Sequence, residues 1–378
     1  MIKRIQIKQE YEIEKGIEGY DNENVNSIQN GYDCGVTIKN DLASRLKNVQ
    51  DNSTNYLPDS FYLRNYAIKA SMNSAYNGTE NTTDMINYVL TRGCRFLDFE
   101  VYKDADIQVP VVSMTKNRDT DFLPLDNGLT ISDALYYVNM YAFNSTSPNY
   151  GDPIFIQIRP KISSKDAATY ETNKSSICYS INDAVMNNLS PLYSGKIVGD
   201  TPMNLLLGKI IIVMDDITFS DCSGITNLSS NMIPYMQTLS YGSISNTPLQ
   251  LLTLKTDKYT CNVSLIRQVI FEDASFVSYN TNVSSNMLFQ NYSCQIVPMM
   301  FWNTGGELCT YETLFNKCGG GIVPFSFIYN ELQKNNSKYI DYPDPMFAFS
   351  LNSNNTTTIV IIVACLGIVG FIVMREIL

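Results

Sequence analysis

The sequence contains no histidine among its 378 residues, and this absence limits the chemistry it can perform. Histidine is the side chain whose unperturbed pKa lies closest to neutral pH, so the most common general acid and base is missing. Basic residues are also scarce, because 27 lysines and arginines stand against 37 aspartates and glutamates and leave a net charge of −10. This balance argues against nucleic acid as a partner and against electrostatic adhesion to anionic lipid surfaces.

The cysteines form no recognisable framework, because they include no CxxC pair and no spacing typical of a metal site. The nine cysteines are Cys34, Cys94, Cys178, Cys222, Cys261, Cys294, Cys309, Cys318 and Cys365. Buried free thiols are favoured over disulfides, since cysteine is among the most frequently buried residue types. A pair such as Cys309 and Cys318 is left open.

The beginning of the chain lacks the apolar core of a secretory signal peptide. Residues 1–54 are polar and charged, and we predict a polar N-terminal extension there. Its alternating start at Ile2, Ile5 and Ile7 is compatible with a strand, a docking arm or a loosely ordered tail.

From about residue 55 the pattern alternates between strands and helices. Helical spacing predicts helices at 85–91 and 131–143, and β-branched or apolar runs predict strands at 96–101, 154–158 and 209–214. The first of these strands turns its acidic side chains to one face. Such alternation predicts an α/β fold with a parallel sheet covered by helices.

The second half of the chain is less regular. Residues 219–247 are rich in Ser, Asn and Asp, and we predict an insertion or linker there, followed by strands at 249–254, 264–271 and 295–302. Residues 331–357 are a predicted linker. The uncharged apolar run that follows approaches the roughly 20 residues that a bilayer requires, so residues 358–375 are predicted to be a transmembrane helix. The simplest topology is a single C-terminal anchor with the folded part on the cytoplasmic side.

Sequons of the form Asn-x-Ser/Thr are numerous, at Asn77, Asn81, Asn144, Asn173, Asn227, Asn262, Asn282 and other positions. A chain this rich in Asn, Ser and Thr acquires many of them by chance, and we expect them to be unused. Glycans on several would overturn the cytoplasmic topology.

Four segments carry a resemblance to a known family. They are Ile68-Lys69-Ala70-Ser71-Met72-Asn73-Ser74-Ala75-Tyr76, Gly93-Cys94-Arg95-Phe96-Leu97-Asp98-Phe99-Glu100, Pro110-Val111-Val112-Ser113-Met114 and Pro153-Ile154-Phe155-Ile156-Gln157-Ile158-Arg159. In this order and spacing they resemble the X half of the catalytic barrel of phosphoinositide-specific phospholipases C. Cys294-Gln295 and the Gly/Val/Pro ending at 319–324 resemble the Y half, less specifically. The resemblance implies a distorted TIM (β/α)₈ barrel, with an X-like half at 55–218 and a Y-like half at 248–330.

The same resemblance implies that the chemistry of the family has been lost. Members of the family have the motif Ser-His-Asn-Thr-Tyr in the first segment and Val-Val-Tyr-His-Gly in the third. Their two catalytic histidines correspond to Met72 and Met114 of this chain. A thioether carries no exchangeable proton, so neither residue can act as a general acid or base. We therefore expect no catalytic residues here.

The metal and phosphate positions of the family are altered as well. The calcium ligands correspond to Asn73, Asp98, Glu100 and Arg159, and an arginine in that shell repels a cation. We expect a carboxylate–guanidinium cluster rather than a metal, with simply solvated carboxylates as the alternative. Two lysines that bind ring phosphates in the family correspond to Val213 and Asp215. We expect no cofactor and no metal.

These observations predict a catalytically inactive, membrane-anchored barrel that serves as a structural or interaction protein. The Asn-rich composition and the absence of signalling domains suggest a minor capsid protein of a large DNA virus, lying between an internal virion membrane and the capsid. The expected partners are the membrane and capsid or other virion proteins. Two alternatives remain open: a lipid- or phosphate-headgroup-binding module, and a phosphodiesterase with a mechanism that does not use histidine.

Overall fold

The structure is a computed structural model of the whole chain. It describes residues 62–103, 109–113, 128–144, 147–162, 167–195, 197–214, 222, 236–241, 266–271, 282 and 284–335. The predicted N-terminal extension, the strand at 249–254 and the transmembrane helix at 358–375 lie outside these residues. No helix within the described part of the chain is long and apolar enough to cross a membrane.

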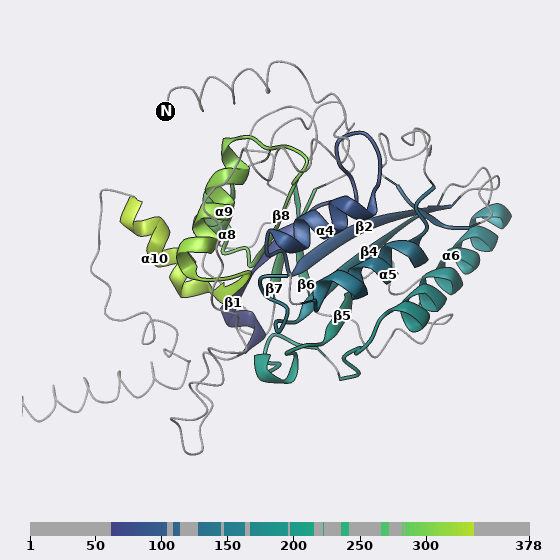
Figure 1. Ribbon diagram of the computed structural model, residues 1–378, viewed down its shortest axis with the longest axis horizontal. Coiled ribbons are helices and arrows are strands. Elements are labelled where there is room, and N and C mark those ends of the chain that lie inside the picture. The colour runs from purple at the N-terminus through teal and green to yellow at the C-terminus, as the bar shows by residue number, and fades with distance from the viewer. Residues whose placement is uncertain are drawn as a thin grey trace, which may run out of the picture.

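One predominantly parallel sheet organises the described residues (Figure 1). Its strands are β1 Tyr66–Ser71, β2 Phe96–Lys103, β3 Val111–Val112, β4 Ile154–Ile162, β5 Ile210–Val213, β6 Met236–Tyr241, β7 Ile266–Phe271, β8 Ile296–Met299 and β9 Ile322–Pro324. The order is β5-β4-β2-β1-β8-β7-β6, with every pairing along this path parallel. β3 and β9 add antiparallel pairs to β2 and β1. The predicted α/β class with a parallel sheet is confirmed. The pairings among the described residues form an open path from β5 to β6, so closure into an eight-stranded barrel stays a prediction.

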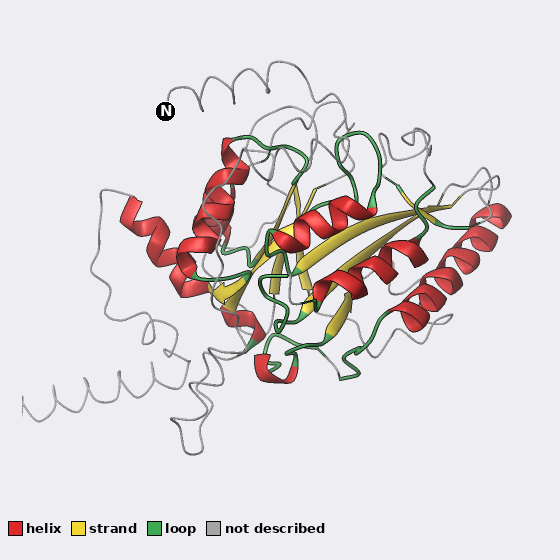
Figure 2. Ribbon diagram, in the orientation of Figure 1, coloured by secondary structure: helices red, strands yellow, loops and turns green. Residues whose placement is uncertain are grey.

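Helices flank the strands (Figure 2). They are η2 Leu63–Asn65, α4 Thr83–Thr91, α5 Ile131–Ala142, α6 Ala167–Asn188, η3 Met203–Leu205, α8 Ser285–Tyr292, α9 Gly306–Cys318 and α10 Phe325–Asn335. Two of them begin at threonine N-caps, because the Thr82 and Thr130 hydroxyls accept hydrogen bonds from the backbone N–H groups of Met85 and Asp133. α9 ends at Gly319, whose φ of 89° is the left-handed conformation that glycine adopts most easily.

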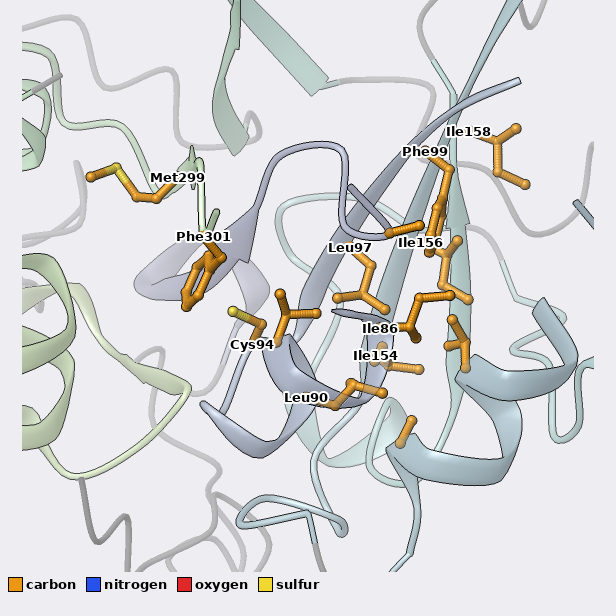
Figure 3. Packing of buried hydrophobic residues seen from close by; sticks show 14 of the residues in the cluster. Ile86, Leu90, Cys94, Leu97, Phe99, Ile154, Ile156, Ile158, Met299 and Phe301 are labelled. Atoms are coloured by element: carbon orange, nitrogen blue, oxygen red, sulfur yellow. The ribbon is translucent and has the colours of Figure 1, made fainter. Parts of the chain in front are cut away.

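The two faces of the sheet pack against different partners. On β2, Leu97 and Phe99 belong to the large core that the helices cover, whereas Phe96 belongs to a second cluster with Ile68, Phe155 and other strand residues. Figure 3 shows Leu97 and Phe99 gathered with Ile154, Ile156 and Ile158 of β4 and with Ile86 and Leu90 of α4. Since side chains alternate along a strand, Asp98 and Glu100 share the inner face with Phe96.

Two predicted boundaries differ from the structure. The predicted insertion at 219–247 contains the sheet strand β6, so part of this interval belongs to the fold rather than to a linker. The polar residues of this interval concealed the strand, because strand prediction depends on apolar alternation. The predicted linker at 331–357 begins inside α10, which continues to Asn335.

The cysteine prediction is also corrected at one pair. Cys178 on α6 and Cys222 form a disulfide that joins positions 44 residues apart. The suggested pairing of Cys309 with Cys318 is wrong, because both lie on α9, where nine residues correspond to roughly 13 Å of helix. A disulfide requires Cα atoms within about 7 Å of each other.

Candidate functional site

Two adjacent parallel strands bring the predicted site residues together. β2 and β4 pair in a register that places Asp98 beside Gln157 and Glu100 beside Arg159. Asp98 and Glu100 are two residues apart, so they project from the same face of β2. A carboxylate pair therefore lies next to a guanidinium within these two strands.

Arg159 engages both carboxylates directly. Its Nε donates to Asp98 Oδ1 at 2.7 Å, and its Nη2 donates to Asp98 Oδ2 at 2.6 Å. Its Nη1 lies 2.8 Å from Glu100 Oε1. The contact with Asp98 is bidentate, and this fork geometry is the strongest arrangement available to a guanidinium and a carboxylate. The expected carboxylate–guanidinium cluster is present.

Asn73 completes this cluster from the loop that follows β1. Its Oδ1 accepts a hydrogen bond of 3.3 Å from Arg159 Nη2, and its backbone N–H donates to Asp98 Oδ2 at 3.0 Å. The loop is fixed further by Ser74, whose backbone N–H donates to the Asp98 carbonyl and whose Oγ accepts from the Asp98 N–H. Asn73 has a φ of 40°, a left-handed conformation that is uncommon outside glycine but that asparagine tolerates better than most residues.

All four residues are buried, with exposed fractions of 3% for Asn73, 2% for Asp98, 3% for Glu100 and 7% for Arg159. The alternative that Asp98 and Glu100 are simply solvated is therefore wrong. Buried charges require partners, and here both carboxylates pair with the Arg159 guanidinium.

The residues present do not fit a calcium ion. Calcium requires six to eight oxygen ligands. Here three carboxylate oxygens and the Asn73 amide oxygen are directed at Arg159, so a cation placed among them would meet a positive charge. Within the described ranges, no group of three or more His, Cys, Asp or Glu side chains is arranged to hold a metal ion.

The other predicted positions are apolar where they are described. Met72 is half-buried after β1, packs against the large core and donates its N–H to the Met299 carbonyl at 2.9 Å. Val213 on β5 is buried in the inner cluster with Phe155. Met114 and Asp215 lie outside the described residues. That these positions correspond to those of the family stays a prediction.

Several polar atoms near the cluster have no hydrogen-bond partner within the described protein. They are Asn73 Nδ2, Ser113 Oγ and Gln268 Oε1, on side chains that are 3%, 1% and 1% exposed. Ser113 follows β3, and its N–H donates to the Glu100 carbonyl. Gln268 on β7 donates from Nε2 to Gln157 Oε1, which connects β7 to β4 across the inner face. The inner face thus retains polar hydrogen-bonding capacity beside Arg159.

A second buried charged cluster was not predicted. Glu312 on α9 accepts from Arg92 Nε at 2.9 Å, from Arg92 Nη2 at 2.7 Å and from Lys69 Nζ at 3.1 Å, and Lys69 also donates to the Arg92 carbonyl. Burial acts to raise the pKa of Glu312, but the neighbouring Lys69 and Arg92 charges outweigh it and lower that pKa. A lysine inside the otherwise apolar strand β1 was the available signal. The cluster faces the helices and lies apart from Arg159.

The chain was compared with protein-family models, with curated protein sequences and with solved structures. No protein-family model matches the chain, and no curated protein sequence matches it either. Among solved structures, L. pealei PLC21 matches with a TM-score of 0.47 and 14% identity over 82% of this chain and 45% of that chain. S. officinalis PLC21 matches with a TM-score of 0.45 and 14% identity over 78% of this chain and 38% of that chain.

A bacterial structure also matches. It is a calcium-dependent phosphoinositol-specific phospholipase C from Pseudomonas sp, with a TM-score of 0.39 and 12% identity over 71% of this chain and 97% of that chain. The chain spans less than half the length of the two PLC21 structures. None of the three matched structures is more than 14% identical to this chain.

Proposed function

We propose that this chain is a catalytically inactive phospholipase C-like barrel that serves as a membrane-anchored structural or interaction protein. The observation that carries the proposal is the ion pairing of Arg159 with Asp98 and Glu100. The carboxylates that a metal-dependent phosphodiesterase would use for its cation are paired with a side chain of the same protein.

The loss of proton transfer supports the same conclusion. Cleavage of a phosphodiester through a substrate hydroxyl requires one group to take a proton and another to supply one. Met72 lies in the loop beside Asn73, where the family places a histidine, and the chain contains no histidine that could replace it. The Arg159 cluster and Met72 thus remove both the metal and the acid–base function.

Anchoring and partners are further parts of the proposal. The apolar residues 358–375 would hold the protein at a membrane, and the folded part would bind a second protein, such as a capsid or other virion protein of a large DNA virus. The inner virion membrane is the location that we propose. A fold persists without its original reaction when its surface remains useful.

The test of inactivity is a cleavage assay on vesicles that contain phosphatidylinositol, with calcium or with a chelator. The matched comparison is the triple variant Met72→His/Met114→His/Arg159→Glu, which restores the residue types of the family. We expect no product from the natural chain under either condition. Calcium-dependent product from the natural chain would refute the proposal, and product from the triple variant alone would support it strongly.

A lipid- or phosphate-headgroup-binding module is the second candidate. It is favoured by the unpartnered Asn73 Nδ2 and Ser113 Oγ, which are buried beside the Arg159 cluster and could donate to a bound ligand. Native mass spectrometry of the full chain after mild detergent extraction tests it. A retained phospholipid that Asn73→Ala releases would favour this candidate over a purely structural role. The third candidate, a phosphodiesterase without histidine, requires product in the vesicle assay that Asp98→Asn abolishes.

A further inference from the structure

Three asparagines that carry glycosylation sequons are structural residues of the core. Asn77, Asn173 and Asn282 each begin an Asn-x-Ser/Thr motif, and their exposed fractions are 3%, 6% and 8%. A glycan is a large hydrophilic group that must lie at the protein surface. The described packing therefore leaves no room for a sugar at these three positions.

Asn282 shows most clearly why a sugar is incompatible. Its Nδ2 donates to the carbonyls of Met300 at 2.9 Å and Asn303 at 3.1 Å, while its Oδ1 accepts from the Met300 N–H at 2.7 Å. These bonds hold the turn that follows β8. N-glycosylation replaces one hydrogen of this same Nδ2, so it would remove a buried hydrogen bond and insert a sugar beside Met300.

The other two sequon asparagines, Asn77 and Asn173, are buried as well. Asn77 Oδ1 accepts from the Thr79 N–H at 2.9 Å, the Glu80 N–H at 3.0 Å and the Thr79 hydroxyl at 2.9 Å, which closes the turn before α4. Asn173 lies on the buried side of α6. Asn144, by contrast, is exposed and could carry a sugar without disturbing the core.

We propose that this chain folds in a compartment where asparagine is not glycosylated, which in a eukaryotic cell is the cytosolic side of the membrane. Sugars are added in the endoplasmic reticulum while the chain is still unfolded, so a sugar at Asn77, Asn173 or Asn282 would block folding. This inference rests on the proposed membrane anchoring only where it assigns the folded part to one side of a membrane. It is independent of whether the Arg159 site is inactive.

The Cys178–Cys222 disulfide requires that the compartment in which the chain folds can oxidise cysteines. Cys178 and Cys222 are both 1% exposed, so the bond forms before or during packing of the core. Its formation releases two protons and two electrons, which a protein disulfide of a thiol oxidase accepts by thiol–disulfide exchange. The secretory pathway normally supplies oxidation and glycosylation together. This chain requires oxidation of Cys178 and Cys222 without glycosylation of its asparagines, so we infer that a thiol oxidase acts on it on the cytosolic side.

The test compares the full chain in its own membrane with the full chain directed into the endoplasmic reticulum by an added signal peptide. The matched control is Ser175→Ala/Ser284→Ala, which removes the sequons of Asn173 and Asn282, keeps every asparagine and leaves the Thr79 hydroxyl that bonds Asn77. Ser284 makes no side-chain capping bond, so its hydroxyl is dispensable to α8. Glycopeptide mass spectrometry reports site occupancy, and limited trypsin digestion separates folded from unfolded protein.

We expect protein from its own membrane to carry no sugar at the three sites and to contain the Cys178–Cys222 bond. In the reticulum, the trypsin-resistant fraction of the natural sequence should also lack sugars there, and the control variant should show a larger resistant fraction. A sugar at any of the three sites in folded protein would overturn the inference, as would an unchanged resistant fraction in the control. Reduced Cys178 in otherwise unglycosylated native protein would overturn the thiol oxidase alone. None of these readouts depends on phosphodiesterase activity, so they fail separately from the proposed function.

Discussion

The substitution Arg159→Met removes a buried charge and keeps most of the aliphatic length of the side chain. Asp98 and Glu100, which are 2% and 3% exposed, would then lose the guanidinium with which both of them pair. Breaking a buried ion pair by removing one partner typically costs about 3–5 kcal/mol, because the remaining charge stays buried without compensation. We expect a loss of this size in the free energy of unfolding.

The assay is urea unfolding at pH 7, followed by circular dichroism, with thermal unfolding as a second measurement. A loss of about 3–5 kcal/mol corresponds to a fall in Tm of roughly 6–20 °C if each kcal/mol shifts Tm by about 2–4 °C. Methionine keeps most of the aliphatic length of arginine, so the lost charge rather than lost volume should dominate.

The control is the triple variant Asp98→Asn/Glu100→Gln/Arg159→Met, which neutralises the whole set. Replacing all members of a buried ionic group is often neutral, whereas removing one is costly, so the triple variant should regain most of the lost stability. A single variant within about 0.5 kcal/mol of the natural chain, the range of ordinary surface substitutions, would refute the reasoning. A triple variant no more stable than the single one would refute it equally.

Three further predictions concern other buried groups. Glu312→Gln should lower the free energy of unfolding by about 3–5 kcal/mol at pH 7, because two cations lose their buried partner. The pKa of Glu312 is lowered in the folded protein, so its contribution to stability is present above about pH 4.3 and is lost as the pH falls below that value. Urea unfolding should therefore show that the stability difference between this variant and the natural chain narrows in acid. Burial raises the pKa of Cys94 to about 12, so at pH 8 iodoacetamide should leave this thiol unmodified in native protein, as judged by mass spectrometry, and should label it in urea; rapid native labelling would contradict its burial. Cys178→Ser should lower stability by about 4 kcal/mol, the loop-closure value for a separation of 44 residues, and a loss that persists after both proteins are reduced would point to packing instead.

The Arg159 site was predictable because its residues obey short-range rules. Asp98 and Glu100 occupy alternate positions of one strand, and Arg159 lies beside Glu100 on a second strand of the same parallel sheet. Alternation along each strand and the parallel pairing of the two strands bring such residues together. The family motifs indicated that these residues belong to one site.

The second cluster could not be predicted by the same rules. Lys69 and Glu312 are 243 residues apart, and Glu312 on a helix is indistinguishable in sequence from a solvated surface glutamate. Their contact depends on the tertiary placement of α9 against β1, which periodicity does not report. The disulfide was missed for a related reason, since an isolated pair of cysteines with no regular spacing gives no connectivity.

The position of β1 in the middle of the sheet has a consequence for biosynthesis. β1 is made early, but its neighbour β8 and the partner of Lys69, Glu312, belong to the last part of the described chain. At about 5–20 residues per second, the ribosome adds the 243 residues between Lys69 and Glu312 in roughly 12–50 seconds. During that interval one edge of β1 and the side chain of Lys69 lack their native partners, so the sheet and the buried charged cluster can be completed only when synthesis is almost finished.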